Sequence, residues 1–320
     1  ARDKLVNMSS SYANNFSNNF SKADGITNTL YSYVDSTIEV ESLNEQEYVL
    51  NYKSRAAEFI KETIKNSDGF FGAYIYFNPE VVDGAHDVYL TKDSAGNITR
   101  QPELEESAYD PNSPSMNWFY RPFKEGKPIW TDPFDGNAVD NKLISHTRAI
   151  VIDGKFIGVV GLDLDFDVVE KTIENINPYD SGFAYIMNAN NNFLVHPVYK
   201  DKESLSDIGL EKEAELMNNN QSGVFTVESR GINMFNGYAK LSNGWIMGVT
   251  APEDEVMAGV FRTRNYLIGI ALAAILLSVL VMYFIINRIA KPITDVADIT
   301  QKIADGDLTV KLPKKQLERK

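Results

Sequence analysis

A run of aromatic and acidic residues at positions 109–135 (YDPNSPSMNWFYRPFKEGKPIWTDPFD) contains the side chains best suited to hold a ligand. Its tryptophans, Trp118 and Trp130, are costly to expose to water, so their rings must pack against something. In one interpretation the run is a loop that its aromatic residues anchor on a sheet. In the other it is an aromatic box with carboxylates. Such a box suits a small cationic ligand, because ring faces stabilise ammonium groups and aspartate neutralises them.

Residue types used in metal binding and covalent catalysis are scarce. His86, His146 and His196 are scattered, and the chain has no cysteine, which excludes disulfides, zinc–thiolate sites and cysteine nucleophiles. The sequence has no glycine-rich phosphate loop and no GxSxG nucleophile elbow. We therefore expect no metal, no cofactor and no enzymatic activity.

One acidic pattern imitates a calcium loop. Asp163, Asp165, Asp167 and Glu174 stand at loop positions 1, 3, 5 and 12. Position 6, where the sharp turn needs glycine, is Val168, and hydrophobic residues alternate with the acids. We interpret the segment as a strand end that runs into a helix.

Residues 266–286 predict a transmembrane helix. The 21 residues contain no charge and no proline, and at about 1.5 Å per residue they span roughly 30 Å, the thickness of a bilayer core. Aromatic residues at both ends, Tyr266 and Tyr283, suit the membrane interfaces. Because the chain starts within a helical pattern, we expect an earlier membrane helix before residue 1.

Charge differs on the two sides of this segment. Residues 1–260 have 39 acidic and 21 basic side chains, whereas residues 261–320 have 5 acidic and 10 basic. The basic excess predicts a cytoplasmic C-terminal side, although Arg262 and Arg264 just before the span weaken that prediction. The acidic region is a poor partner for nucleic acid, whose phosphates it repels.

The elements that must position the aromatic run follow from hydrophobic periodicity. Apolar residues at steps of three and four predict a long N-terminal helix over residues 5–38, with an interruption near Asp24 and Gly25, and a second helix over 45–66. Period-two patterns then predict strands at 72–77, 88–91, 143–152 and 156–164, with Asp153-Gly154 as a hairpin turn, and a helix over 166–176.

A second unit begins at residue 182, where GFAYIM echoes GAYIYF at residues 72–77. Further strands are expected at 193–196, 223–229, 234–241 and 245–250, with a helix near 211–219. The chain is therefore α+β: a long N-terminal helix and two antiparallel-sheet units, followed by the membrane helix.

The segment after the membrane helix has an apolar stripe of its own. It ends at a turn over residues 305–308, and it is formed by Ile293, Val296, Ile299, Ile303 and Ala304. A stripe that continues from a membrane helix predicts a dimeric, coiled-coil-like connector.

Taken together, these features resemble a bacterial methyl-accepting chemotaxis receptor with a double Cache sensor. The resemblance lies in WFYRPFKEGKPIWTDPF from Trp118, IDGKFIGVVGLDLDFD from Ile152 and the GFAYIMNANNNFLVHP hairpin. The tail RIAKPITDVADITQKIADGDLTVKL resembles a HAMP linker. The resemblance to this receptor family implies two PAS-like (Cache) units in residues 1–260. The membrane-distal unit covers about 45–176, and the proximal unit covers about 177–252. The transmembrane helix at 266–286 and a partial HAMP linker at 287–320 would follow.

The resemblance also implies a site. In the amino-acid-binding members an Arg-x-Trp-aromatic motif holds the ligand carboxylate and a later Gly-x-Asp binds the ammonium group. Trp118, Phe119 and Asp163 match, but Met116 replaces the arginine, which favours an amine or another ligand without an α-carboxylate. Our hypothesis is that Trp118, Phe119 and Phe134 form the wall, and that Asp163 with Asp132 or Asp135 holds an ammonium group.

The expected function is extracytoplasmic sensing of a small amine or amino-acid-like metabolite by a chemotaxis transducer in the inner (cytoplasmic) membrane. Its expected partners are a second copy of the chain and, through a C-terminal part, a cytoplasmic kinase and adaptor. One alternative keeps the sensor but gives it the output of a histidine kinase or cyclic-dinucleotide enzyme. Another is a membrane-anchored extracytoplasmic enzyme, for which no catalytic constellation is seen.

Overall fold

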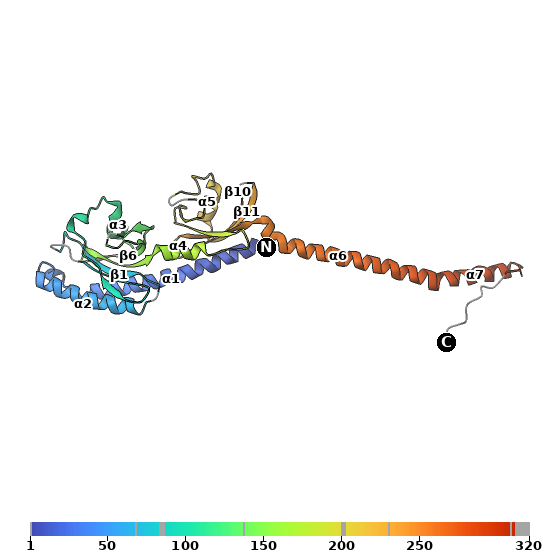
Figure 1. Ribbon diagram of the computed structural model, residues 1–320, viewed down its shortest axis with the longest axis horizontal. Coiled ribbons are helices and arrows are strands. Elements are labelled where there is room, and N and C mark those ends of the chain that lie inside the picture. The colour runs from blue at the N-terminus through green and yellow to red at the C-terminus, as the bar shows by residue number, and fades with distance from the viewer. Residues whose placement is uncertain are drawn as a thin grey trace. The chain divides into compact units, whose positions relative to one another are not determined.

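The computed structural model describes residues 2–67, 69–82, 87–136, 138–199, 203–229, 231–307 and 309–310. His86, Leu308 of the connector turn and residues 311–320 of the expected HAMP linker lie outside the described residues. The chain divides into two compact units, Ala1–Val256 and Met257–Lys320. The first contains both sheets and their cores, so we take it as the sensor unit (Figure 1).

Helix α1 (Arg2–Thr37) runs beneath both sheets of the sensor unit. It passes Asp24 and Gly25 without a break, so the expected interruption there is wrong. Glycine in a helix costs about 1 kcal/mol relative to alanine, and burial of Ala23 and Thr27 beside it offsets that cost. The buried stripe continues along the helix through Leu5, Ser9, Ala13, Phe20, Ala23, Thr27, Leu30 and Val34.

The first module is a seven-stranded antiparallel sheet, counted over the described residues. Its order is β3-β2-β1-β7-β6-β4, and β5 also pairs with β6. The strands are β1 (Gly72–Phe77), β2 (Asp87–Lys92), β3 (Ile98–Arg100), β4 (Ile129–Trp130), β5 (Phe134–Asp135), β6 (Lys142–Ile152) and β7 (Lys155–Asp165). The expected hairpin turn is confirmed, because Asp153 and Gly154 both have positive φ, at 50° and 77°.

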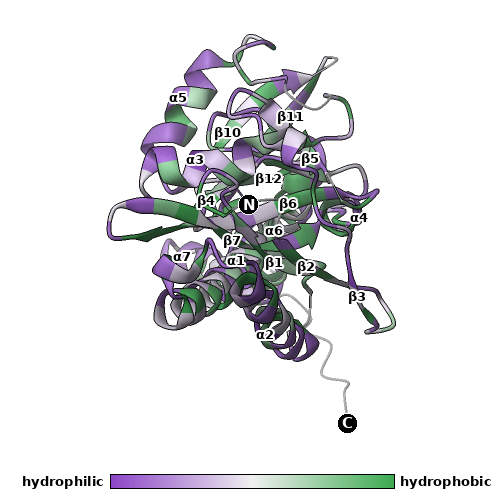
Figure 2. Cartoon of the chain, turned by 90° about the vertical axis from the view of Figure 1, so that its left-hand side faces the viewer, coloured by the Kyte–Doolittle hydropathy of each residue, from purple (hydrophilic) through white to green (hydrophobic). Residues whose placement is uncertain are grey.

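The two faces of this sheet have different neighbours. One face packs on α1 and on α2 (Gln46–Lys65), as the contacts of Phe77 with Tyr52 and of His146 with Thr27 show. Residues alternate between faces along a strand, so Tyr74, Tyr76 and Asp163 face the other side. In Figure 2 the strands β1, β6 and β7 are largely hydrophobic and appear above α2, whose outer side is hydrophilic.

The second module is a five-stranded sheet of order β10-β11-β12-β8-β9. Helix α4 (Phe166–Glu174) leads into it, and Asp165 caps that helix by accepting from the Asp167 amide, so the predicted passage from strand to helix is confirmed. The elements are β8 (Phe183–Met187), β9 (Phe193–Val195), α5 (Glu211–Asn219), β10 (Ser222–Ser229), β11 (Ile232–Lys240) and β12 (Ile246–Pro252).

The sequence similarity between residues 72–77 and 182–187 corresponds to the same packing of a tyrosine over a glycine in both modules. Tyr74 of β1 pairs with Gly161 of β7, and Tyr185 of β8 pairs with Gly248 of β12. Each tyrosine ring covers its glycine: a Cβ atom on Gly161 would lie 2.2 Å from the Tyr74 ring, and one on Gly248 would lie 2.0 Å from the Tyr185 ring. The two strand pairs are therefore equivalent in register.

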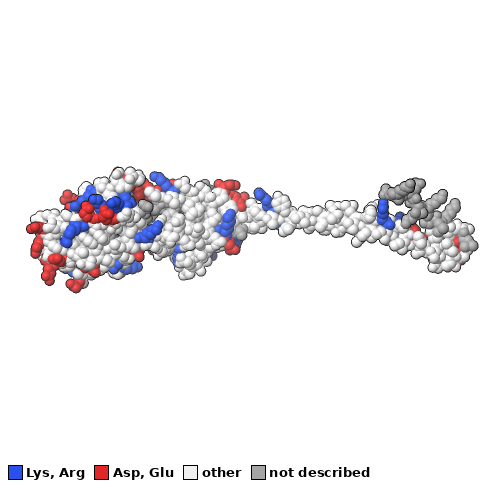
Figure 3. Space-filling view, turned by 90° about the horizontal axis from the view of Figure 1, so that it is seen from below, with Lys and Arg blue, Asp and Glu red and all other residues white. Residues whose placement is uncertain are grey.

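Helix α6 (Glu253–Ile285) follows β12 directly and continues through a π-helical segment (Ile286–Ala290) into α7 (Lys291–Ala304). By length and composition it is a candidate membrane span, and its most apolar part is unburied. Figure 3 shows a long stretch of it without charged atoms.

Candidate ligand-binding site

The aromatic run 109–135 is not one loop, because its centre forms a helix. A 3-10 turn (Pro114–Met116) leads into α3 (Asn117–Glu125), and Gly126, at φ 64°, ends the helix in the left-handed conformation that glycine adopts readily. Trp118, Phe119 and Pro122 form the buried face of this helix. The interpretation as a plain loop is therefore wrong for these residues.

Pro122 helps to fix Trp118. A proline has no N–H, so it cannot donate to the carbonyl four residues earlier, which is that of Trp118. The Thr147 hydroxyl on β6 donates to that carbonyl instead, at 2.7 Å in a buried position. The helix is thereby tied to the sheet at the residue whose ring faces the cavity.

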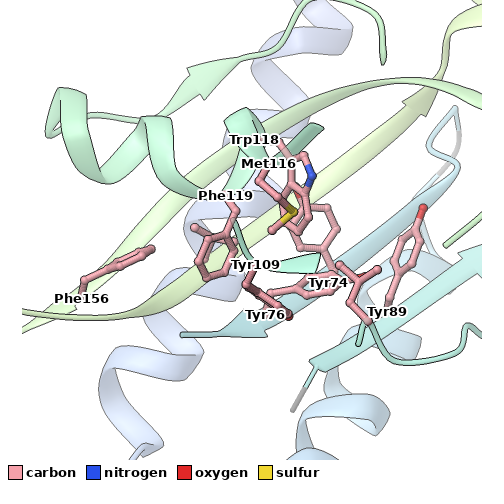
Figure 4. Packing of buried hydrophobic residues seen from close by; sticks show 10 residues of the cluster. Tyr74, Tyr76, Tyr89, Tyr109, Met116, Trp118, Phe119 and Phe156 are labelled. Atoms are coloured by element: carbon pink, nitrogen blue, oxygen red, sulfur yellow. The ribbon is translucent and has the colours of Figure 1, made fainter. Parts of the chain in front are cut away.

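A small cavity lies between α3 and the sheet. Its volume is about 20 Å³, enough for about one water molecule. The Trp118 ring meets Tyr74 and Tyr76 edge-on, with centroid distances of 5.3 and 4.9 Å, as Figure 4 shows. The described lining residues are Tyr74, Tyr76, Tyr89, Trp118, Phe134, Ala138, Val139, Leu143, Ser145 and Asp163.

Asp163 is the acidic residue of this cavity. It is 3% exposed, and the hydroxyl of Ser145, its partner across β6 and β7, donates to its Oδ1. Burial raises its pKa to about 7, because removal from water disfavours the charged form more than the Ser145 hydrogen bond favours it. The cavity therefore contains a carboxyl group that gains from a cation.

Three further polar atoms of the lining are buried without a hydrogen-bond partner of normal geometry among the described residues. They are the hydroxyls of Tyr74 and Tyr89 and Nε1 of Trp118. The Tyr89 hydroxyl still lies near enough to Asp163 to lower the pKa of that acid. Buried polar groups are usually satisfied, so a cluster of unsatisfied ones calls for an explanation. A polar occupant of the cavity would provide partners for them.

The structure brings together three of the six predicted site residues, Trp118, Phe134 and Asp163. Phe119 is fully buried, but it lies away from the cavity within the same hydrophobic cluster. Its ring packs edge-on against Tyr109 and Phe156, with centroid distances of 5.1 and 5.3 Å. In Figure 4 it lies toward Phe156, with Tyr89 at the opposite end.

The two alternative acids also lie away from the cavity. Asp132 accepts a 3.0 Å hydrogen bond from the Asn188 side chain of the second module. It borders the junction of the modules, where Phe20 contacts Trp130 at 4.3 Å and Trp245 at 5.6 Å. Asp135 is exposed and opposes Lys142 in the pairing of β5 with β6. Of the predicted acids, only Asp163 lines the cavity.

Sequence reasoning missed the tyrosines and Ser145. Alternation in GAYIYF places Tyr74 and Tyr76 on one face, but nothing local says which face meets α3. Ser145 is found only through its register with Asp163.

Comparison with known proteins gives a match to the Cache domain family over residues 4–260. Methyl-accepting chemotaxis protein McpA of Bacillus subtilis is 26% identical over 273 residues, which cover 84% of this chain and 39% of that protein. Methyl-accepting chemotaxis protein PctB of Pseudomonas aeruginosa is 29% identical over 226 residues, 68% of this chain and 35% of that one. The chain thus spans well under half the length of these relatives.

Solved structures of sensor regions share the fold. The extracellular domain attributed to a histidine kinase, mmHK1S-Z3, has a TM-score of 0.62 and 21% identity, covering 81% of this chain and 97% of that one. The periplasmic sensory domain of the Campylobacter jejuni chemoreceptor Tlp1 has a TM-score of 0.61 and 17% identity, with coverage of 80% and 96%. The Tlp3 sensory domain of the same organism, solved with isoleucine bound, has a TM-score of 0.55 and 14% identity, with coverage of 80% and 94%. With a family match across most of its length, this chain belongs to the Cache domain family.

Proposed function

We propose that the chain is the sensing and membrane-spanning part of a chemotaxis transducer, and that its first module binds a small ligand carrying an ammonium group. The chemotaxis relatives reported above support the transducer assignment. The observation that carries the ligand assignment is Asp163, a buried carboxyl group inside an aromatic cavity.

The other residues that line the cavity narrow the class of ligand to one without a carboxylate. No Lys or Arg occurs among the described residues around the cavity. Met116, which stands where the resemblance to the family implies an arginine, is 1% exposed within the same hydrophobic cluster. Aromatic faces and a carboxylate suit an ammonium group, but they offer no counter-charge to a carboxylate. We therefore favour a primary amine over an amino acid, even though the Tlp3 neighbour was solved with isoleucine.

A ligand larger than one water molecule must enlarge the cavity. The wall formed by Phe134, Ala138 and Val139 is only partly buried and is therefore the side that can yield. Opening would separate these residues from Trp118 and the tyrosines. The energy of binding would thus be coupled to a change of shape in the first module.

Titration calorimetry on residues 1–256 tests the ligand assignment. This unit contains both cores, and the matching solved structures are isolated sensor regions. We expect ethylamine or a larger primary amine to bind, and Asp163→Asn to weaken it at least tenfold. Asp135→Asn, a change at an exposed acid, should leave the affinity unchanged. Tight binding of plain amino acids, undiminished by Asp163→Asn, would contradict the assignment.

Signal transfer is proposed as a two-state equilibrium that the ligand biases. Helix α1 contacts both sheets and β12 continues into α6, so a shape change in the first module has a connected path to the candidate membrane helix and the HAMP-like segment. In this proposal the sensor unit lies outside the cytoplasmic membrane, the receptor is a homodimer, and a cytoplasmic kinase and adaptor read the signal. Saturating ligand that leaves the output of a full-length receptor unchanged would count against it.

A histidine kinase is the second candidate, because the solved regions that share this fold include the one attributed to a histidine kinase. Incubation of the full-length protein with labelled ATP distinguishes the two. A histidine kinase labels itself, whereas a chemotaxis transducer acquires no phosphate in the absence of a separate kinase.

A further inference from the structure

The second module contains a larger hollow than the first. Its volume is about 450 Å³, within the range of small-molecule sites. Most of its lining is aromatic or aliphatic. The residues around it include Phe183, Tyr185, Phe193, His196, Tyr199 and Val227.

Strand register places this hollow at the position equivalent to the first cavity. Tyr185 lies over Gly248 as Tyr74 lies over Gly161. Two residues beyond the glycine, the first module has Asp163 and the second has Thr250.

The neighbouring strand continues the correspondence. Ser145 faces Asp163 across β6 and β7, and Asn236 faces Thr250 across β11 and β12. In the second module the Thr250 hydroxyl donates to Oδ1 of Asn236, so the pair is satisfied without a charge. The equivalent place therefore carries a neutral hydrogen-bonded pair where the first module carries an acid.

His196 gives the hollow one polar anchor. Its ring lies among Phe183, Tyr185, Phe193 and Tyr199, with centroid distances from 4.6 to 5.5 Å. Its Nδ1 accepts from the backbone amides of Val198 and Tyr199 at 3.0 and 3.1 Å. Burial lowers the pKa of His196 to about 4, so the ring is neutral at pH 7 and carries its proton on Nε2.

Nε2 has no hydrogen-bond partner within the described part of the chain. Glu228, exposed, is the one charged side chain among the described lining residues. We infer that this hollow is a second binding site, separate from the amine site, for a small uncharged aromatic compound with an acceptor oxygen. A cavity of about 150 Å³ already accepts benzene, so a substituted ring fits.

The experiment compares three probes of similar size on residues 1–256. Acetophenone is neutral with an acceptor oxygen, and ethylbenzene is neutral without one. Benzylammonium is charged and, as a primary amine, should bind the first module instead, so Asp163→Asn should weaken its binding. We expect acetophenone to raise the unfolding temperature saturably and to bind about fivefold more tightly than ethylbenzene, the effect of one neutral hydrogen bond. Asp163→Asn should leave acetophenone binding unchanged, which separates this site from the amine site.

Paired variants locate the binding. Val227→Trp fills the hollow from β10 and should abolish acetophenone binding, whereas Thr226→Trp, at the exposed neighbouring position, should not. His196→Asn retains an acceptor for the two amides but lacks the Nε2 proton, so it should remove the preference for acetophenone over ethylbenzene. Equal binding to Val227→Trp and wild type would overturn the inference.

A measurement on the unaltered protein guards against misfolded variants. With ¹³C-methyl methionine labelling, acetophenone should shift the signal of Met234, which lines the hollow, and leave that of Met116 in the first module unchanged. A Met234 signal that stays in place at saturating acetophenone would also overturn the inference.

Discussion

The Ser145 hydroxyl donates a hydrogen bond to Oδ1 of Asp163 across two neighbouring strands, in a cavity whose described lining holds no cation. This hydrogen bond, together with the weaker influence of the Tyr89 hydroxyl, only partly replaces the water that Asp163 loses on burial. The folded chain therefore maintains an acid whose charged form is poorly stabilised, and the proposed ammonium ligand would stabilise it. This arrangement has consequences for both stability and binding.

Replacement of Asp163 should stabilise the sensor unit in a pH-dependent manner. Its pKa rises from 3.8 unfolded to about 7 folded, so between these values the folded state binds the extra proton and stability falls as pH rises. Asp163→Asn removes this loss. We expect the variant to gain up to about 4 kcal/mol above pH 7 and nothing near pH 4. Urea unfolding at both pH values, with Asp135→Asn as control, measures it; a pH-independent difference would contradict the buried-acid account.

Amine binding should depend on the same group. An ammonium ligand prefers ionised Asp163, so lowering the pH from 8 to 6 should weaken ethylamine about tenfold as the carboxyl group takes up its proton. Above pH 8 the affinity should level off while the amine stays charged. Calorimetry across this range tests the prediction, and an affinity that rises toward pH 6 would exclude Asp163 as the partner.

The bond from Thr147 to the Trp118 carbonyl should matter because of Pro122. Thr147→Val leaves the buried carbonyl without a donor and should cost about 1–3 kcal/mol. In a Pro122→Ala background residue 122 regains its N–H and can satisfy that carbonyl, so the same change should cost about 1 kcal/mol less. Denaturant unfolding of the four proteins in this double-mutant cycle gives the difference; equal costs in both backgrounds would refute the compensation.

The glycines beneath the two tyrosines should not tolerate a methyl group. Gly161→Ala and Gly248→Ala each force a tyrosine ring aside and should cost at least about 1–3 kcal/mol. Gly25→Ala in α1 is the matched control, since no atom lies within 4 Å of its added Cβ. It should stabilise the helix by about 1 kcal/mol. Thermal unfolding of the three variants tests the contrast.

Phe20 should couple the modules, because its ring contacts Trp130 of the first and Trp245 of the second. Phe20→Ala should cost about 3–5 kcal/mol, the usual range for a fully buried phenylalanine. Phe123, which is 42% exposed, provides a milder control. We expect Phe20→Ala to split the unfolding curve into two transitions; a single transition shifted no further than that of Phe123→Ala would count against the coupling.

Much of the architecture was predictable from local pattern. The strands at 72–77, 143–152 and 156–164 and the helix at 211–219 follow from period, turn residues and polarity, and the structure has them within one or two residues of those bounds. The place of Asp163 near the end of a strand was predictable too, because the pattern from Asp163 onward predicts a strand end that runs into a helix.

The rest depends on contacts that sequence spacing does not encode. Prolines and polar residues made 109–135 look like a loop, yet α3 forms because Trp118 and Phe119 bury one face against the sheet. Asp132 and Asp135 were reasonable acids by proximity in sequence. Asp132 instead hydrogen-bonds to Asn188 of the second module, and Asp135 pairs with Lys142 between β5 and β6, so neither lines the cavity. Local propensity contains no information about such partners.

Because α1 packs on both modules, it also determines when the sensor unit can finish folding as the chain is synthesised. The Ser17 hydroxyl accepts a hydrogen bond from the Ser242 amide, a contact 225 residues apart in sequence. The apolar stripe of α1 is synthesised well before its partners on β11 and β12. Contacts of such long range slow folding and prolong the exposure of apolar surface. The part of α1 that packs on β11 and β12 therefore stays uncovered until the second module has been synthesised.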